Sequence, residues 1–251
     1  METVITVDGK KFSGQDFITY LKLNNEFDDI VERMVRDKVT VCAGAKKGFA
    51  VSNEELQENA DNLRRHVGLH RAKDTQAWLD EQNLTLDDFE THITDMVMKR
   101  KVQEDVVTDA AIEAYFQQHS PKFDTVDLKQ IALDNESKAK EMAALLEDDA
   151  DLFGELAQAH SIDEETRNNG GLMQGVRRGT LAPEVEAKLF NAADGDIVGP
   201  IQLGDSDFFE VFVVTQKHNA NLSDVVKDEV GETLFREWLA ERLDEISVSA
   251  G

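Results

Sequence analysis

The sequence predicts an α+β protein in which a long all-α segment is combined with a small α/β unit. Apolar residues recur at three- and four-residue spacing through most of residues 13–119, which is typical of amphipathic helices. Three later stretches, 126–133, 197–203 and 208–216, are rich in branched and aromatic side chains and are expected to be strands. Residues 222–246 return to the helical spacing and predict one terminal helix.

The first helical segment and the terminal helix each carry a stripe of apolar side chains that must pack against another element. We therefore expect them to pack on each other as one domain, residues 1–122 plus 220–251. The α/β unit, residues 123–219, would be inserted between them as a second domain. No internal repeat or low-complexity linker interrupts this order.

The N-terminal elements are delimited by turn and capping signals. Alternation over residues 3–12 with Asp8-Gly9 predicts a short strand and a turn. A Ser or Thr followed three residues later by an acid predicts a helix start, and this pattern occurs at Ser13, Ser52 and Thr85. The helices expected before the α/β unit begin near residues 13, 27, 52, 74, 85 and 108.

In the α/β unit, predicted helices, turns and strands follow one another at short intervals. Residues 136–147 and 151–159 have helical patterns, and Pro183 begins a short helix that extends to Asn191. Residues 168–179 hold four glycines and are expected to form turns. The last two strands are expected to be joined by the polar turn 204–207.

Charge and composition exclude several classes of partner. The 251 residues carry a formal charge of −24, so no basic stripe is available for nucleic acid, and anionic membrane surfaces are disfavoured. No apolar run approaches the roughly 18 residues of a transmembrane helix. The single cysteine, Cys42, is expected on a buried helix stripe. It permits no intrachain disulfide and, with an N-terminus that lacks a signal-peptide pattern, predicts a cytoplasmic location.

The sequence offers little support for metal or covalent chemistry. His66 and His70 have the i, i+4 spacing of two ligands on a helix, but Val67 stands where a zinc protease has Glu. Nucleophile-elbow, phosphate-loop and dinucleotide motifs are lacking. We expect neither a metal nor a cofactor.

A long ordered string in the α/β unit resembles the core of parvulin-type peptidyl-prolyl cis-trans isomerases. Its features are the helix FGELAQAHS, Asp163, Gly170-Gly171, Arg178-Gly179, Pro183-Glu184, Phe190, and the run Gly195 to Pro200 before a closing strand. The upstream segments VDGKKFSGQDF, WLDEQNLTLDDFETHI and VTDAAIEAYFQQHSPKF are similar to the helical chaperone domain of the SurA and PrsA group. The resemblance implies a small mixed sheet flanked by helices.

The resemblance also implies a site with a polar network and an apolar cup. The family usually carries histidines where this chain has Gln130 on the first strand and Glu210 on the last, whereas the central acid is kept as Asp163. We take these three residues as the candidate catalytic group. The implied peptide-binding residues are Leu181, Val185, Phe190, Phe208, Phe209 and Met173. Leu181 and Val185 replace the usual Met and Phe, and core packing is the alternative role for the apolar residues.

Three functions are consistent with these features. The first is a peptide-binding chaperone, or foldase, that binds extended or proline-containing segments of clients with weak or lost isomerase activity. The second is an active prolyl isomerase, or rotamase, that uses Gln130, Asp163 and Glu210. The third is a dedicated partner protein for one client peptide. Exposed apolar faces on the helical domain would permit a homodimer.

Overall fold

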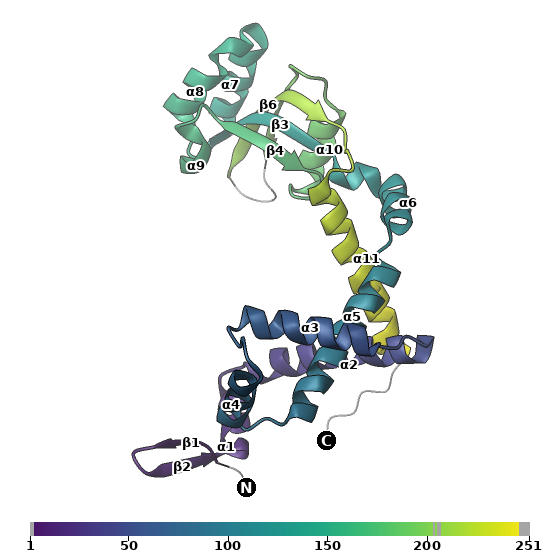
Figure 1. Cartoon of the computed structure of the whole chain (residues 1–251). Coiled ribbons are helices and arrows are strands. Elements are labelled where there is room, and N and C mark those ends of the chain that lie inside the picture. Colours follow the sequence, from purple (N-terminus) through teal and green to yellow (C-terminus); the bar gives the residue numbers. More distant parts are fainter. Residues whose placement is uncertain (1–2, 203, 205–206, 246–251) are drawn as a thin grey trace. The chain divides into compact units, whose positions relative to one another are not determined.

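The computed structural model describes residues 3–202, 204 and 207–245. The chain forms two compact units (Figure 1). The helical unit comprises Met1–Ile112 and Val230–Gly251, and the sheet unit comprises Glu113–Glu229. These bounds lie about ten residues from the expected domain limits at 122 and 220. Contacts of the intervening residues explain the difference, because Phe116 packs on Phe123 and Glu229 pairs with Arg177 within the sheet unit.

The helical unit begins with a hairpin and continues through helices that the capping signals predicted. Its elements are β1 (Thr3–Val7), β2 (Lys10–Ser13), α1 (Gly14–Leu23), α2 (Phe27–Lys47), α3 (Asn53–His66), α4 (Ala72–Gln82), α5 (Leu86–Val106), the start of α6 (Asp109–His119) and most of α11 (Asp224–Glu245). Ser13, Ser52 and Thr85 each form a reciprocal capping box with the acid three residues later, which confirms all three predicted starts. Ile246, the last residue of the expected terminal helix, lies outside the described residues.

The core of the helical unit is centred on α5. Leu79, Phe89, Ile93 and Val97 form a buried cluster there. Helix α2 crosses α5 at Gly44, where a Cβ atom would lie 2.7 Å from the Met98 Sδ atom. The prediction for Cys42 is wrong, because α2 turns Val39, Thr40 and Gly44 inward and leaves Cys42 exposed.

The sheet unit contains four strands and the helices that cover them. Its elements are η1 (Ser120–Phe123), β3 (Thr125–Leu133), α7 (Glu136–Asp148), η2 (Ala150–Leu152), α8 (Phe153–His160), α9 (Glu164–Arg167), β4 (Leu172–Arg177), α10 (Pro183–Asn191), β5 (Ile197–Gln202) and β6 (Phe209–His218). The order is β4-β3-β6-β5 and every pairing is antiparallel, so the expectation of a mixed sheet is wrong. The turn-rich stretch 168–179 also contains strand β4, which the glycines concealed.

The two faces of the sheet bury different clusters, as alternation along a strand requires. Val211 and Val213 of β6 pack under α7 and α8, whereas Phe212 and Val214 pack with residues of α10. Figure 1 shows α7 and α8 on one side of the sheet and α10 on the other. Within the described part of the chain, none of the helices combines the length and apolarity needed to cross a bilayer.

Candidate functional site

The structure brings together the two residues that replace the family's histidines. Gln130 lies on β3 and Glu210 on β6, and these strands pair so that Gln130 faces Phe212 and Glu210 faces Ala132. The two side chains are therefore diagonal neighbours across the strands. The Gln130 Nε2 atom donates a hydrogen bond of 2.7 Å to the Glu210 Oε1 atom. The pair thus forms a polar patch on the α10 side of a largely apolar sheet.

The environment of Glu210 favours its protonated form. Burial is the main cause of the raised pKa of this carboxyl, and the negative charge of Asp163 adds to it. Both effects penalise the carboxylate, the first through lost hydration and the second through repulsion. Glu210 therefore keeps its proton to a higher pH than an ordinary glutamate does.

Asp163 is held in place by its own short helix. It is the N-cap residue of α9, where its Oδ1 atom accepts the Glu165 backbone N–H at 3.1 Å and its Oδ2 atom accepts the Thr166 hydroxyl. Because both oxygens already have donors, Asp163 acts on the site mainly through its charge. The sequence placed Asp163 at the site but did not reveal this capping role.

A buried serine that the sequence analysis missed fixes Asp163 against β3. Ser161 is 3% exposed, and its Oγ atom accepts the backbone N–H groups of Ala132 at 3.1 Å and of Asp163 at 3.3 Å. The Ile162 N–H also donates to the Ala132 carbonyl at 2.8 Å. The only sequence signal was a Ser directly after a helix and two residues before the acid.

Gly171 brings a second loop against Gln130. Its φ is +79°, and a Cβ atom there would lie 2.3 Å from the Gln130 carbonyl oxygen. The Gln130 N–H donates to the Gly171 carbonyl at 2.8 Å. Only glycine combines this backbone conformation with so close an approach, so the Gly170-Gly171 pair positions the first residue of the polar patch.

The apolar residues of the predicted cup have separate locations. Val185 and Phe190 are 2% and 9% exposed and belong to the core cluster under α10, so Val185 fills the interior instead of lining an open cup. Met173 and Leu181 are half-buried at the edge of the same cluster. The Arg178 guanidinium lies 4.0 Å from the centre of the Phe190 ring, a contact that the sequence analysis did not foresee.

The two closing aromatic residues have different surroundings. Phe209 packs against the cluster under α7 and α8, so its assignment to the cup is wrong. Alternation along β6 is the reason, because Glu210 points to the α10 side and its neighbour must point to the other. Phe208 lies just before β6 and is 50% exposed, and its role in binding stays a prediction.

Comparison with known proteins gives the sheet unit a family. Residues 117–231 match the family described as rotamase, PPIC-type PPIASE domain. The chain contains a PPIC-type peptidyl-prolyl isomerase domain. Both residues of the polar patch, together with Asp163 and the supporting Gly171, lie within this domain.

Relatives extend the likeness over the rest of the chain. The foldase protein PrsA of Halalkalibacterium halodurans is 23% identical over 243 residues, which cover 94% of this chain and 71% of that protein. Foldase protein PrsA 2 of Bacillus cereus is 24% identical over 241 residues, which cover 95% of this chain and 78% of that protein. A crystal structure of the peptidylprolyl isomerase PrsA from Bacillus cereus superposes with a TM-score of 0.51 at 16% identity, covering all of this chain and 94% of that one. This superposition shows a shared fold.

The described residues contain no group of three or more His, Cys, Asp or Glu side chains arranged to hold a metal ion. His66, which the sequence analysis considered as a ligand, ends α3, and His70 lies in the loop after it. The two histidines therefore do not share one helical face, which the zinc-ligand spacing would require.

Proposed function

We propose that this chain is a foldase that binds extended, proline-containing segments of client polypeptides and catalyses their isomerisation only weakly. The family of the sheet unit and the relatives that span the helical unit support the peptide-binding part. The Gln130–Glu210 hydrogen bond supports the weak-catalysis part, because it engages the groups that stand where the family's histidines stand.

The physical task of an isomerase explains why these replacements matter. Rotation about an X–Pro bond costs about 18–20 kcal/mol, because amide resonance must be lost. A catalyst lowers this barrier by favouring the twisted amide over both planar forms. Gln130 and Glu210 are hydrogen-bonded to each other instead, and Val185 is buried in the core cluster under α10. A bound peptide would then meet the half-buried Met173 and Leu181 at the edge of the cluster.

The proposal is tested by measuring how fast the full chain isomerises an Ala-Xaa-Pro-Phe peptide, with coupled proteolysis as the readout. We expect saturable binding of the peptide with little acceleration of its cis-to-trans conversion. Leu181→Ala should weaken the binding, whereas Leu145→Ala, at an exposed position of α7 over the opposite face of the sheet, serves as the matched control. Isomerisation rates comparable with those of a highly active parvulin would refute weak catalysis.

A fully active isomerase is the second candidate, and the raised pKa of Glu210 favours it. A protonated carboxyl can donate a hydrogen bond to the amide as it twists. Under this candidate Asp163→Ala lowers the isomerisation rate while the fold stays intact, because the Glu210 pKa is then raised by burial alone and no longer also by the neighbouring charge. An unchanged rate in that variant would remove Asp163 from the site.

The remaining expectations concern the cellular setting. A dedicated role with one client, pairing of two copies through the helical unit, and a cytoplasmic location stay predictions. Co-purification of one stoichiometric partner, the molar mass in solution, and cell fractionation test them in turn.

A further inference from the structure

The backbone just before Asp163 takes the place of a strand beside the end of β3. Strand β4 begins at Leu172, so its pairing with β3 stops short of Ala132. There the Ile162 N–H donates to the Ala132 carbonyl at 2.8 Å, and the Ser161 Oγ atom accepts the Ala132 N–H at 3.1 Å. The same Oγ atom accepts the Asp163 N–H at 3.3 Å. The Ser161 side chain therefore ties the residue that carries the charge directly to β3.

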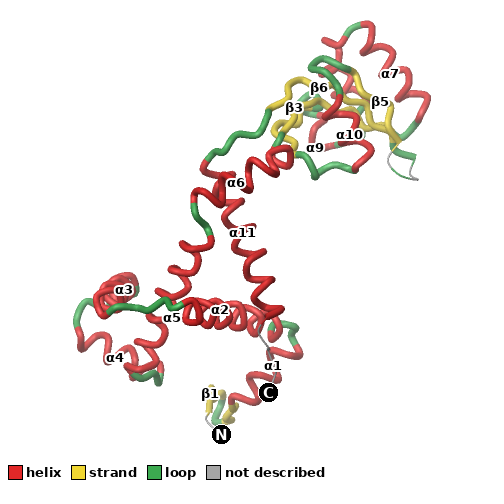
Figure 2. The backbone as a smooth tube through the Cα atoms, turned by 90° about the vertical axis from the view of Figure 1, so that its right-hand side faces the viewer, coloured by secondary structure: helices red, strands yellow, loops and turns green. Residues whose placement is uncertain are grey.

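Ala132 separates this segment from Glu210. On its other side β3 pairs with β6, and Glu210 is the direct register partner of Ala132. Both strands are drawn in yellow in Figure 2. Residues opposite each other on paired strands point to the same face, so only the methyl group of Ala132 stands between the docked segment and the Glu210 side chain. The negative charge of Asp163 acts on Glu210 across this small residue.

The other elements around Glu210 present groups that do not ionise. Strand β3 contributes Ala132 and Gln130, β5 contributes the register partner Ile201, and α10 covers this face with apolar side chains. Asp163, at the start of α9, is the described group whose charge raises the pKa of Glu210. The further charged residues of α9 are Glu164, Glu165 and Arg167.

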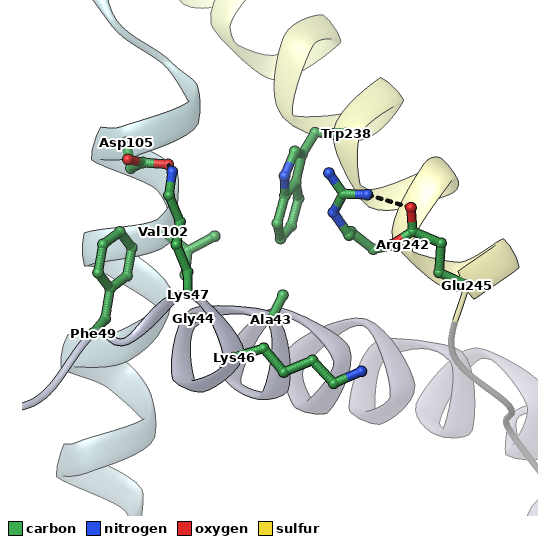
Figure 3. A pocket seen from close by; sticks show the side chains of 10 residues that line it. All are labelled: Ala43, Gly44, Lys46, Lys47, Phe49, Val102, Asp105, Trp238, Arg242 and Glu245. Carbon is green, nitrogen blue, oxygen red and sulfur yellow. Dashed lines mark hydrogen bonds and ion pairs between the residues drawn. The ribbon is translucent and has the colours of Figure 1, made fainter.

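Carboxyl groups in the helical unit are arranged differently. In a hollow of about 340 Å³ among α2, α5 and α11, Asp105 pairs with Lys47 and Glu245 pairs with Arg242 (Figure 3). A cation beside a carboxylate favours its charged form. Glu210 instead has an amide and a second carboxylate as neighbours. Its charge state therefore depends on where the second carboxylate is held.

We propose that Ser161 is a positioning residue of the prolyl site, which anchors the Asp163 carboxylate beside Ala132 and so sets the charge that a bound peptide meets at Glu210. With the carboxylate in place, Glu210 keeps its proton to a higher pH. Its Oε1 atom accepts the Gln130 amide, which leaves a proton on Oε2 available to the carbonyl that precedes a bound proline. The inference rests on the proposed function and adds the residue that controls this donor.

Titration of the Glu210 carboxyl in the full chain tests the proposal, with its ¹³C NMR signal assigned by comparison with Glu210→Gln. Ser161→Ala leaves two backbone N–H groups without their acceptor, so we expect the segment to shift and the titration midpoint of Glu210 to fall towards that of an ordinary glutamate. Ser161→Thr keeps the hydroxyl and should restore the wild-type midpoint. Ser161→Cys, whose thiol is a weak acceptor, makes the same test if the alanine variant does not fold.

A double-variant cycle separates positioning from a merely structural role. Asp163→Asn removes the charge but keeps an oxygen for the cap of α9, so it should lower the Glu210 midpoint by itself. In that background Ser161→Ala should cause no further shift, because no charge is left to position. An equal shift with and without the Asp163 charge would overturn the inference.

Two controls complete the experiment. Thr40→Ala removes a hydroxyl that is also 3% exposed, from α2 of the helical unit, and should leave the Glu210 midpoint unchanged. Glu164→Gln removes an exposed charge of α9 and should shift the midpoint less than Asp163→Asn does. An unchanged midpoint in Ser161→Ala would overturn the inference. Since the titration contains no peptide, its result is independent of the isomerisation assay.

Discussion

The N-terminal hairpin and the four-stranded sheet are both antiparallel, but only the sheet is covered. Every residue of β1 is exposed, whereas Val211 to Val214 of β6 are all buried. The difference comes from the helices, because α7 and α8 cover one face of the sheet and α10 the other. The comparison teaches that strand sequence alone does not decide burial, and that apolar side chains left without cover are candidates for binding.

The largest expected effect concerns the glycine that supports the covered sheet. Gly171→Ala should destabilise the sheet unit by more than about 4 kcal/mol, because the added Cβ meets the Gln130 carbonyl at 2.3 Å. Gly175→Ala is the matched control, since its φ is also positive but nothing lies within 4 Å of its Cβ. It should cost about 1–2 kcal/mol. Urea unfolding followed by circular dichroism measures both, and equal losses would contradict the close approach.

Truncation of one apolar side chain in each region sharpens the comparison. Leu128→Ala removes a side chain that is 0% exposed and should cost about 2–5 kcal/mol. Val4→Ala, at 53% exposure in the hairpin, should change the free energy of unfolding by less than about 0.5 kcal/mol. Thermal unfolding of the full chain compares them. A large loss for Val4→Ala would mean that the hairpin is covered in solution.

A smaller effect is expected at the polar patch within the covered sheet. Because the folded-state pKa of Glu210 is raised, ionisation of this carboxyl opposes folding once the pH exceeds the ordinary value of about 4.3. Glu210→Gln should therefore stabilise the chain at pH 7 and lose this advantage below about pH 4. Urea unfolding at several pH values measures the gain. Glu147→Gln, at an exposed position of α7, is the matched control substitution.

Sequence reasoning located most elements, because caps, turns and periodicity are local signals. Ser13, Ser52 and Thr85 begin helices as predicted, and Asp8-Gly9 forms the hairpin turn. Strand β4 was not predicted, because its pairing with β3 is decided by residues distant in sequence and its glycines resemble those of a loop.

The candidate site was predictable only in part. The resemblance brought Gln130 and Glu210 together, and the structure adds the hydrogen bond between them. The misassigned Phe209 shows the limit, since neighbouring strand positions point to opposite faces. Ser161 could not be found from the sequence, because its importance comes from the backbone N–H groups that it accepts.

The most direct test of the account asks whether the Gln130–Glu210 pair limits catalysis. Exchange spectroscopy by NMR can measure both the affinity for a proline peptide and its isomerisation rate on the full chain. The account predicts that the wild-type chain binds the peptide with little acceleration, and that Gln130→His with Glu210→His raises the rate severalfold at similar affinity. A wild-type rate as high as that of the double variant would contradict it.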